Sequence, residues 1–102
     1  MINLNNINDK ELKQLLTNDN INIFNDQNND LYVEVYSYNT DLAENEKTAK
    51  NLFNRIKKYK EDILSLYNKD YFIISIDSYS IDGLYQSNSN LLFKDSKIYN
   101  LY

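Results

Sequence analysis

The sequence predicts a single α+β domain over residues 1–102, in which a small antiparallel sheet carries one long and one short helix packed on one face. Three observations predict this class. Apolar residues recur every three or four positions in one long segment, they alternate with polar residues in two others, and the strand-like segments are clustered along the chain. Clustered strands are typical of an antiparallel sheet with its helices on one side.

The short helix is expected over residues 8–17. Asn8 suits the N-cap position, and Glu11 stands three residues later as its capping-box partner. The apolar stripe of this helix consists of Leu12, Leu15 and Leu16. This stripe predicts that one side of the helix is buried.

The long helix is expected to begin at Asp41, with Glu44 completing a second capping box. Acidic residues lie near its start and basic residues further along, which matches the helix dipole. Its apolar positions recur at spacings of three and four and predict one continuous buried face: Ala49, Leu52, Phe53, Ile56, Tyr59, Ile63, Leu66 and Tyr67.

The first two strands are predicted at Ile21–Phe24 and Leu31–Tyr38, joined as a hairpin by a polar turn. The turn begins like a calcium loop, because Asp26, Asn28 and Asp30 offer oxygen ligands at alternate positions. The place of the loop glycine is taken by Leu31 and that of the closing glutamate by Ser37. We therefore expect a turn here and no metal site.

The C-terminal third is predicted to consist of strands. Tyr71–Ile81 is the strongest of them, and Asp82-Gly83 supplies a type I′ turn into a short strand at Leu84–Gln86. The polar stretch Ser87–Asn90 is expected to separate this short strand from a last hairpin. That hairpin consists of Leu91–Phe93 and Ile98–Tyr102 around a turn at Asp95-Ser96.

The chain has no His, Cys, Trp or Pro and a single Gly, at position 83. These absences remove most of the side chains that enzymes use for nucleophilic attack, proton transfer at neutral pH and soft-metal binding, and also the glycine-rich loops that hold phosphates. We expect a protein that is not an enzyme and has no cofactor. The abundance of Asn, Ile, Lys and Tyr indicates an AT-rich genome, so composition by itself is weak evidence of function.

The start of the chain shows no basic region followed by an apolar core, and no apolar run has the roughly 20 residues that a membrane helix needs. A cytoplasmic protein without disulfides is the expectation.

Charge is unevenly distributed in a chain whose net charge is −4. Residues 47–69 carry seven bases and two acids, whereas the segments on either side are acidic. One hypothesis is a nucleic-acid-binding helix face, which would use Lys47, Lys50, Asn54, Lys57 and Lys58. The alternative is that this helix face is simply exposed to solvent and binds nothing. A single Arg in the chain and acidic segments on both sides favour this alternative, because they weaken contacts with phosphates.

Tyrosines and carboxylates share one face of the two best strands. If the aliphatic side chains of these strands meet the helices, the opposite face presents Tyr32, Glu34, Tyr36, Tyr38, Asp77 and Tyr79. Tyrosine is favoured at recognition surfaces because it combines a large contact area with a polar tip. The alternative is that these tyrosines serve only strand formation and cross-strand pairing.

The leading interpretation is a small acidic binding protein whose tyrosine–carboxylate face covers a basic nucleic-acid-binding or catalytic groove of a partner protein. In general character the chain resembles the small inhibitors carried by phages and mobile elements, such as anti-CRISPR and other anti-defence proteins. Immunity proteins and antitoxins that neutralise a toxin are an alternative class, as is the nucleic-acid-binding module. A homodimer formed by pairing of the strand at Ile98–Tyr102 is a further hypothesis.

Overall fold

The computed structural model describes residues 4–39, 42–80 and 86–101. These residues form a short 3-10 helix, three α-helices and five β-strands. In chain order the elements are η1 (Leu4–Asn6), α1 (Lys10–Leu16), β1 (Ile21–Asn25), β2 (Leu31–Asn39), α2 (Leu42–Lys58), α3 (Lys60–Tyr67), β3 (Tyr71–Ser80), β4 (Gln86–Lys94) and β5 (Lys97–Asn100). The predicted α+β class is confirmed.

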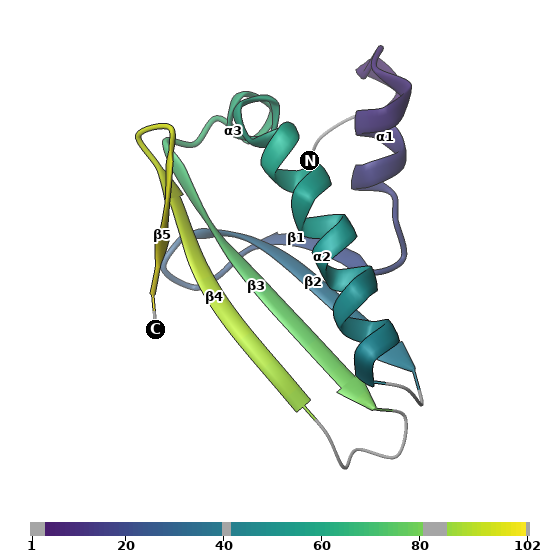
Figure 1. Ribbon diagram of the computed structural model, residues 1–102. Coiled ribbons are helices and arrows are strands. Elements are labelled where there is room, and N and C mark those ends of the chain that lie inside the picture. Colours follow the sequence, from purple (N-terminus) through teal and green to yellow (C-terminus); the bar gives the residue numbers. More distant parts are fainter. Residues whose placement is uncertain (1–3, 40–41, 81–85, 102) are drawn as a thin grey trace.

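The five strands form one sheet in the order β1-β2-β3-β4-β5, with α2 and α3 packed against one face (Figure 1). Three neighbouring pairs are antiparallel, as expected, and β2 and β3 are parallel. The parallel pair arises because α2 and α3 lie between these two strands in the chain and carry it back to the end of the sheet where β2 began. The edges of the sheet are β1 and β5.

The hydrophobic core lies between the helices and this face of the sheet. Its most completely buried side chains are Leu15, Ile56 and Ile63 from the helices and Leu31, Val33, Val35, Phe72, Ile74 and Phe93 from the strands. The rings of Phe72 and Phe93, which are fully buried in this layer, approach with centroids 5.3 Å apart. In β2, buried and half-buried residues alternate strictly from Leu31 to Ser37, so its predicted alternation corresponds to two real faces.

The predicted single long helix is in fact two helices that meet at Tyr59, where the backbone leaves helical geometry at φ −104° and ψ 17°. The change of direction at Tyr59 lets Ile63 and Leu64 point into the core that α2 already covers. Tertiary packing therefore divides a segment whose periodicity is continuous.

The short helix is present, but its N-cap is Asp9 rather than the predicted Asn8. The Asp9 carboxylate accepts hydrogen bonds from the backbone N–H groups of Glu11 (2.9 Å) and Leu12 (3.1 Å). The Glu11 side chain contacts α2 and the following turn instead of closing a capping box. The predicted caps and turns at Asp41 and Asp82-Gly83 lie outside the described residues, as do Ile81 and residues 84–85 of the predicted strands.

The polar stretch Ser87–Asn90 is not a break between strands, as predicted, but part of β4. This nine-residue strand pairs with β3 from end to end. Its polar residues are accommodated because one face of the sheet carries no helix, so that Asn88 and Asn90 can hydrogen bond there. The predicted turn at Asp95-Ser96 is confirmed, and both residues have the positive φ angles, 55° and 61°, of a type I′ hairpin.

Candidate partner-binding face

The face of the sheet that carries no helix is here called the open face. On β2 it contains Tyr32, Glu34 and Tyr36, which alternate with core residues and are half-buried. These are three of the six residues that the sequence assigned to a binding face. The backbones of two more, Tyr38 and Tyr79, are paired with each other in the parallel register, and their side chains lie outside what the structure describes.

The strand register aligns one apolar residue from every strand in a row across the open face. From β1 to β5 these residues are Phe24, Tyr32, Ile73, Leu92 and Tyr99, and they are called the open-face belt below. The rings of Phe24 and Tyr32 stack almost parallel, with centroids 5.4 Å apart. The two ends of the row are the most exposed: Phe24 on β1 is 37% exposed and Tyr99 on β5 is 43% exposed.

Four of the five belt residues were not among the predicted site residues. They are far apart along the chain, and only the pairing between strands brings them into one row. The signal that could have found them is the polarity alternation of β3 and of the last hairpin, combined with a correct register.

A polar row lies beside the belt. It contains Asn22, Glu34, Ser75 and Asn90, which are cross-strand neighbours on β1 to β4. Glu34 is the acidic member of this row, and its neighbours are neutral hydrogen-bonding groups. Among the described residues the ion pair that forms is Lys58–Glu11, and it does not involve Glu34. The centre of the open face therefore combines an apolar row with an amide and hydroxyl row containing one carboxylate.

Asp77, the sixth predicted residue, is on the open face but only 7% exposed. Its Oδ1 accepts a hydrogen bond from the Asn88 side-chain amide, and its Oδ2 accepts one from the Ser75 hydroxyl at 3.4 Å. Asn90 in turn donates to the Asn88 side-chain oxygen at 2.9 Å. The Asp77 carboxylate is thus the buried acceptor of a small network, of which Asn88 is exposed and Ser75 and Asn90 are half-buried.

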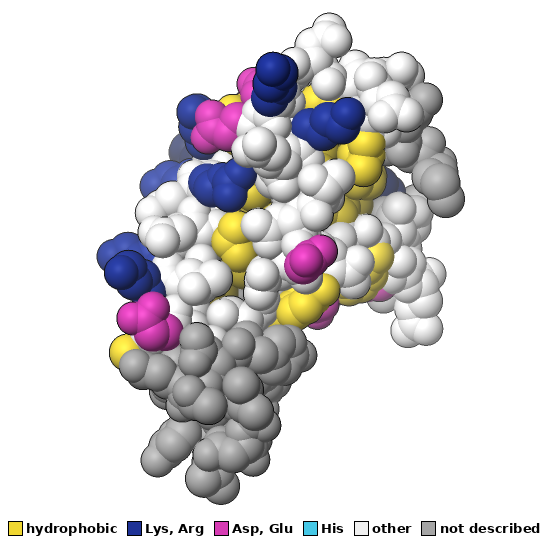
Figure 2. Space-filling view, turned by 90° about the vertical axis from the view of Figure 1, so that its right-hand side faces the viewer, with side chains coloured by type: hydrophobic (Ala, Val, Ile, Leu, Met, Phe, Trp, Pro, Cys, Tyr) yellow, Lys and Arg dark blue, Asp and Glu magenta, His cyan; other side chains and the backbone are white. Residues whose placement is uncertain are grey.

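The basic residues of the alternative site lie on the helical side of the molecule. Lys47, Lys50, Asn54, Lys57 and Lys58 are all exposed along α2. In Figure 2 the helical layer lies toward the left, and Lys and Arg side chains gather there with Asp and Glu side chains among them. Lys58 is engaged by an ion pair with Glu11 at 3.1 Å.

The Glu11 carboxylate, which pairs with Lys58, also accepts a hydrogen bond of 2.9 Å from the Tyr59 hydroxyl. Burial of the ring, followed by this hydrogen bond, raises the pKa of Tyr59 to about 12. The hydrogen bond from Lys58 is the main cause that lowers the pKa of Glu11 below its ordinary value of 4.5. These contacts of Glu11 with Lys58 and Tyr59 attach α1 to the end of α2. Their role is therefore structural.

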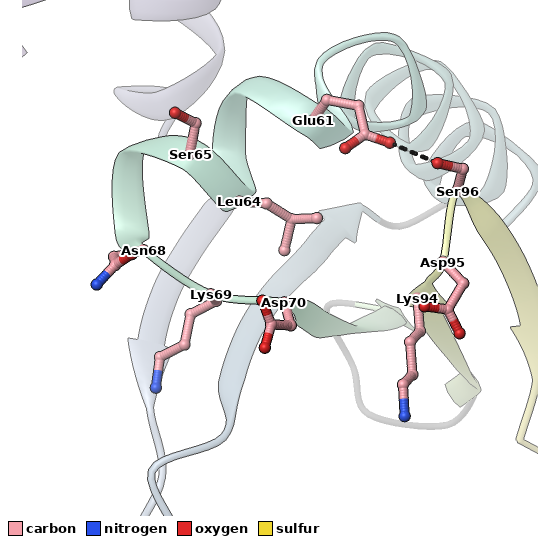
Figure 3. Close-up of a pocket in the computed structure, with 9 residues that line it drawn as sticks. All are labelled: Glu61, Leu64, Ser65, Asn68, Lys69, Asp70, Lys94, Asp95 and Ser96. Carbon is pink, nitrogen blue, oxygen red and sulfur yellow. Dashed lines mark hydrogen bonds between the residues drawn. The ribbon is translucent and has the colours of Figure 1, made fainter.

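A cleft of about 620 Å³ lies between α3 and the β4–β5 turn (Figure 3). Its lining mixes both signs of charge: Glu61, Leu64, Ser65, Asn68, Lys69, Asp70, Lys94, Asp95 and Ser96. The Ser96 hydroxyl donates to Glu61 at 3.2 Å across its mouth, and the Lys69 ammonium donates to the Asn29 carbonyl at 2.8 Å. Several of its polar groups are therefore occupied by contacts within the chain.

Within the described segments no group of three or more His, Cys, Asp or Glu side chains is placed to hold a metal ion. In the turn that resembles the start of a calcium loop, the Asp26 carboxylate accepts the N–H groups of Asn28 and Asp30, both at 2.9 Å. That carboxylate shapes the β1–β2 turn, as the sequence interpretation expected.

No protein-family model, curated protein or solved structure matches the chain. Over the described residues, no helix has the length and apolar character needed to cross a membrane.

Proposed function

We propose that this chain is a non-enzymatic binding protein that covers a surface of a partner protein with its open face. The observation that carries the proposal is the open-face belt, an apolar row that crosses all five strands on the side of the sheet without helices. Contiguous apolar surface on a small protein marks an interaction site more often than isolated apolar residues do.

The composition of the open face favours a protein partner. Aromatic and aliphatic side chains beside neutral amide groups are typical of the central part of protein interfaces. The carboxylate of Glu34 would repel a phosphate backbone approaching the same area. The basic groups of α2 lie on the opposite side of the molecule, so they do not contribute to this face.

The net charge of −4 supports a partner whose surface is basic, because charges outside the contact area steer the encounter. The finer proposal is an inhibitor of the anti-CRISPR or anti-defence kind that occupies a nucleic-acid-binding or catalytic groove. An immunity protein or antitoxin that neutralises a toxin would use the same face in the same way.

Site-specific photo-crosslinking in living cells of a low-GC bacterium tests the proposal. A photoreactive residue is placed at Leu92, the belt residue on β4, and in a separate variant at Asn54, which is exposed on α2. A discrete crosslinked protein is expected from the Leu92 position and not from Asn54, with or without nuclease treatment. The same product from Asn54 alone would contradict the proposal.

The exposure of all five residues along α2 supports nucleic-acid binding as the second candidate function. The four lysines of this set would contribute at most four phosphate contacts, so the logarithm of the affinity for duplex DNA should fall with a slope of about −3.6 against the logarithm of salt concentration. A slope near zero would exclude this candidate. The control is Lys47→Gln with Lys57→Gln, which should halve the slope.

A further inference from the structure

Glu34 occupies a distinctive position within the open face. It lies on β2, an inner strand of the sheet that pairs in parallel with β3. Its cross-strand neighbours are Asn22 on β1 and Ser75 on β3. Tyr32 and Tyr36 stand two residues before and after it on the same face, each about 7 Å away along the strand. The Glu34 carboxylate is therefore bordered by aromatic and neutral polar groups, and the Asp77 carboxylate, which accepts a hydrogen bond from Ser75, is its diagonal neighbour on β3.

Over the described residues of the sheet, no basic side chain is a cross-strand neighbour of Glu34. Its cross-strand neighbours carry no charge, and the basic residue Lys94 pairs with Tyr71, four residues along β3 from Ser75. That separation corresponds to about 13 Å along the strand, in addition to the distance across β3 and β4. Lys97 lies still farther out, opposite Lys94 on β5.

We infer that the open face recognises an arginine side chain of the partner protein, with Glu34 as its carboxylate anchor and the belt as the contact for flanking apolar residues. Arginine matches this site better than lysine, because its planar guanidinium can form two parallel hydrogen bonds to a carboxylate and can also stack on an aromatic ring. The Tyr32 ring is held by its stacking on Phe24, which presents a preorganised aromatic border beside Glu34.

This inference rests on the proposed function, since it names the chemistry of the partner at the same face. It can nevertheless fail separately. A partner that binds the belt through apolar contacts alone would leave the proposed function intact and would show no preference for arginine.

The test uses three short peptides titrated into the isotopically labelled full chain while backbone amide resonances are followed by NMR. The probes are acetyl-Leu-Arg-Leu-amide, acetyl-Leu-Lys-Leu-amide and acetyl-Leu-Gln-Leu-amide. The arginine peptide is expected to shift the resonances around Glu34 most strongly and to bind two- to fivefold more tightly than the glutamine peptide, the range that a half-exposed ion pair supplies.

The substitution Glu34→Gln should remove this preference, whereas Glu46→Gln, at an exposed carboxylate on α2, should leave it unchanged. The side chain of glutamine has nearly the same shape as that of glutamate, and the amide spectrum verifies that each variant is folded. Equal binding of the three peptides at the belt would overturn the inference and spare the proposed function. Failure of all three peptides to perturb the open face would count against both.

Discussion

Replacing Asp77 and Asn88 with alanine, singly and together, tests whether the Asp77 carboxylate is structural or available to a partner. Asp77 is 7% exposed, and the Asn88 amide donates a hydrogen bond to its Oδ1. A double-mutant cycle isolates the energy of this contact from the other consequences of each replacement. If the carboxylate serves the network, the two substitutions should be strongly coupled.

The expected size of the coupling follows from the surroundings of the two groups. A hydrogen bond to a charged acceptor contributes about 1.5–3 kcal/mol to the free energy of unfolding. Asn88 is exposed, so that water can solvate its amide when Asp77 is absent, and this places the coupling in the lower part of the range. We expect a coupling of about 1.5–2 kcal/mol.

Urea unfolding followed by circular dichroism measures the four free energies of the cycle. For a domain of this size, about 1 kcal/mol shifts the midpoint by roughly 0.3–1 M urea, which is readily resolved. The control cycle combines Asp77→Ala with Asp70→Ala, because Asp70 lies seven residues away, about 23 Å along the strand. These two substitutions should be additive within about 0.5 kcal/mol.

A coupling below about 0.5 kcal/mol between Asp77 and Asn88 would refute the structural role. The Asn88 amide would then not be the group that holds the Asp77 carboxylate in place.

The remaining predictions concern stability. Tyr59→Phe should remove a pH dependence: a phenol whose pKa is raised to about 12 stabilises the folded state fully below its ordinary pKa of 10 and loses this contribution as the pH rises through 12. Thermal unfolding between pH 9 and 12 should therefore show a decline in the wild type that is smaller in the variant, and equal declines would contradict the assignment. Asn68 ends α3 with a φ of 53°, so Asn68→Ala should cost about 1 kcal/mol in urea unfolding, whereas Asn68→Gly should change stability by only a few tenths. Phe72→Ala removes a fully buried ring and should lower the free energy of unfolding by about 3–5 kcal/mol, and a loss under 1 kcal/mol would mean that the core is not packed as described.

The elements that the sequence predicted well are those whose evidence is local. The alternation of Leu31–Ser37 and the three- and four-residue spacing from Ala49 to Ile63 correspond to a more buried and a less buried face in the structure. Such periodicities follow from the geometry of a single strand or helix and need no knowledge of its neighbours.

The elements that were missed depend on distant parts of the chain. The break at Tyr59 lets Ile63 and Leu64 of α3 enter the core, although the apolar periodicity of the segment runs through without interruption. Ser87–Asn90 is strand because β3 offers it a partner along its whole length, and Asp77 on that partner satisfies the Asn88 amide. A polar run read by itself contains no sign of either contact.

The sequence by itself determined the α+β class, the buried side of each periodic segment and the placement of Tyr32, Glu34 and Tyr36 on the side of β2 away from the core. Only the tertiary structure decided that β2 and β3 run parallel, that Asp77 is enclosed, and that Phe24, Tyr32, Ile73, Leu92 and Tyr99 form one row. The physical reason is that the side to which a residue points depends on its own strand, whereas the residue beside it depends on a register set by packing across the whole sheet.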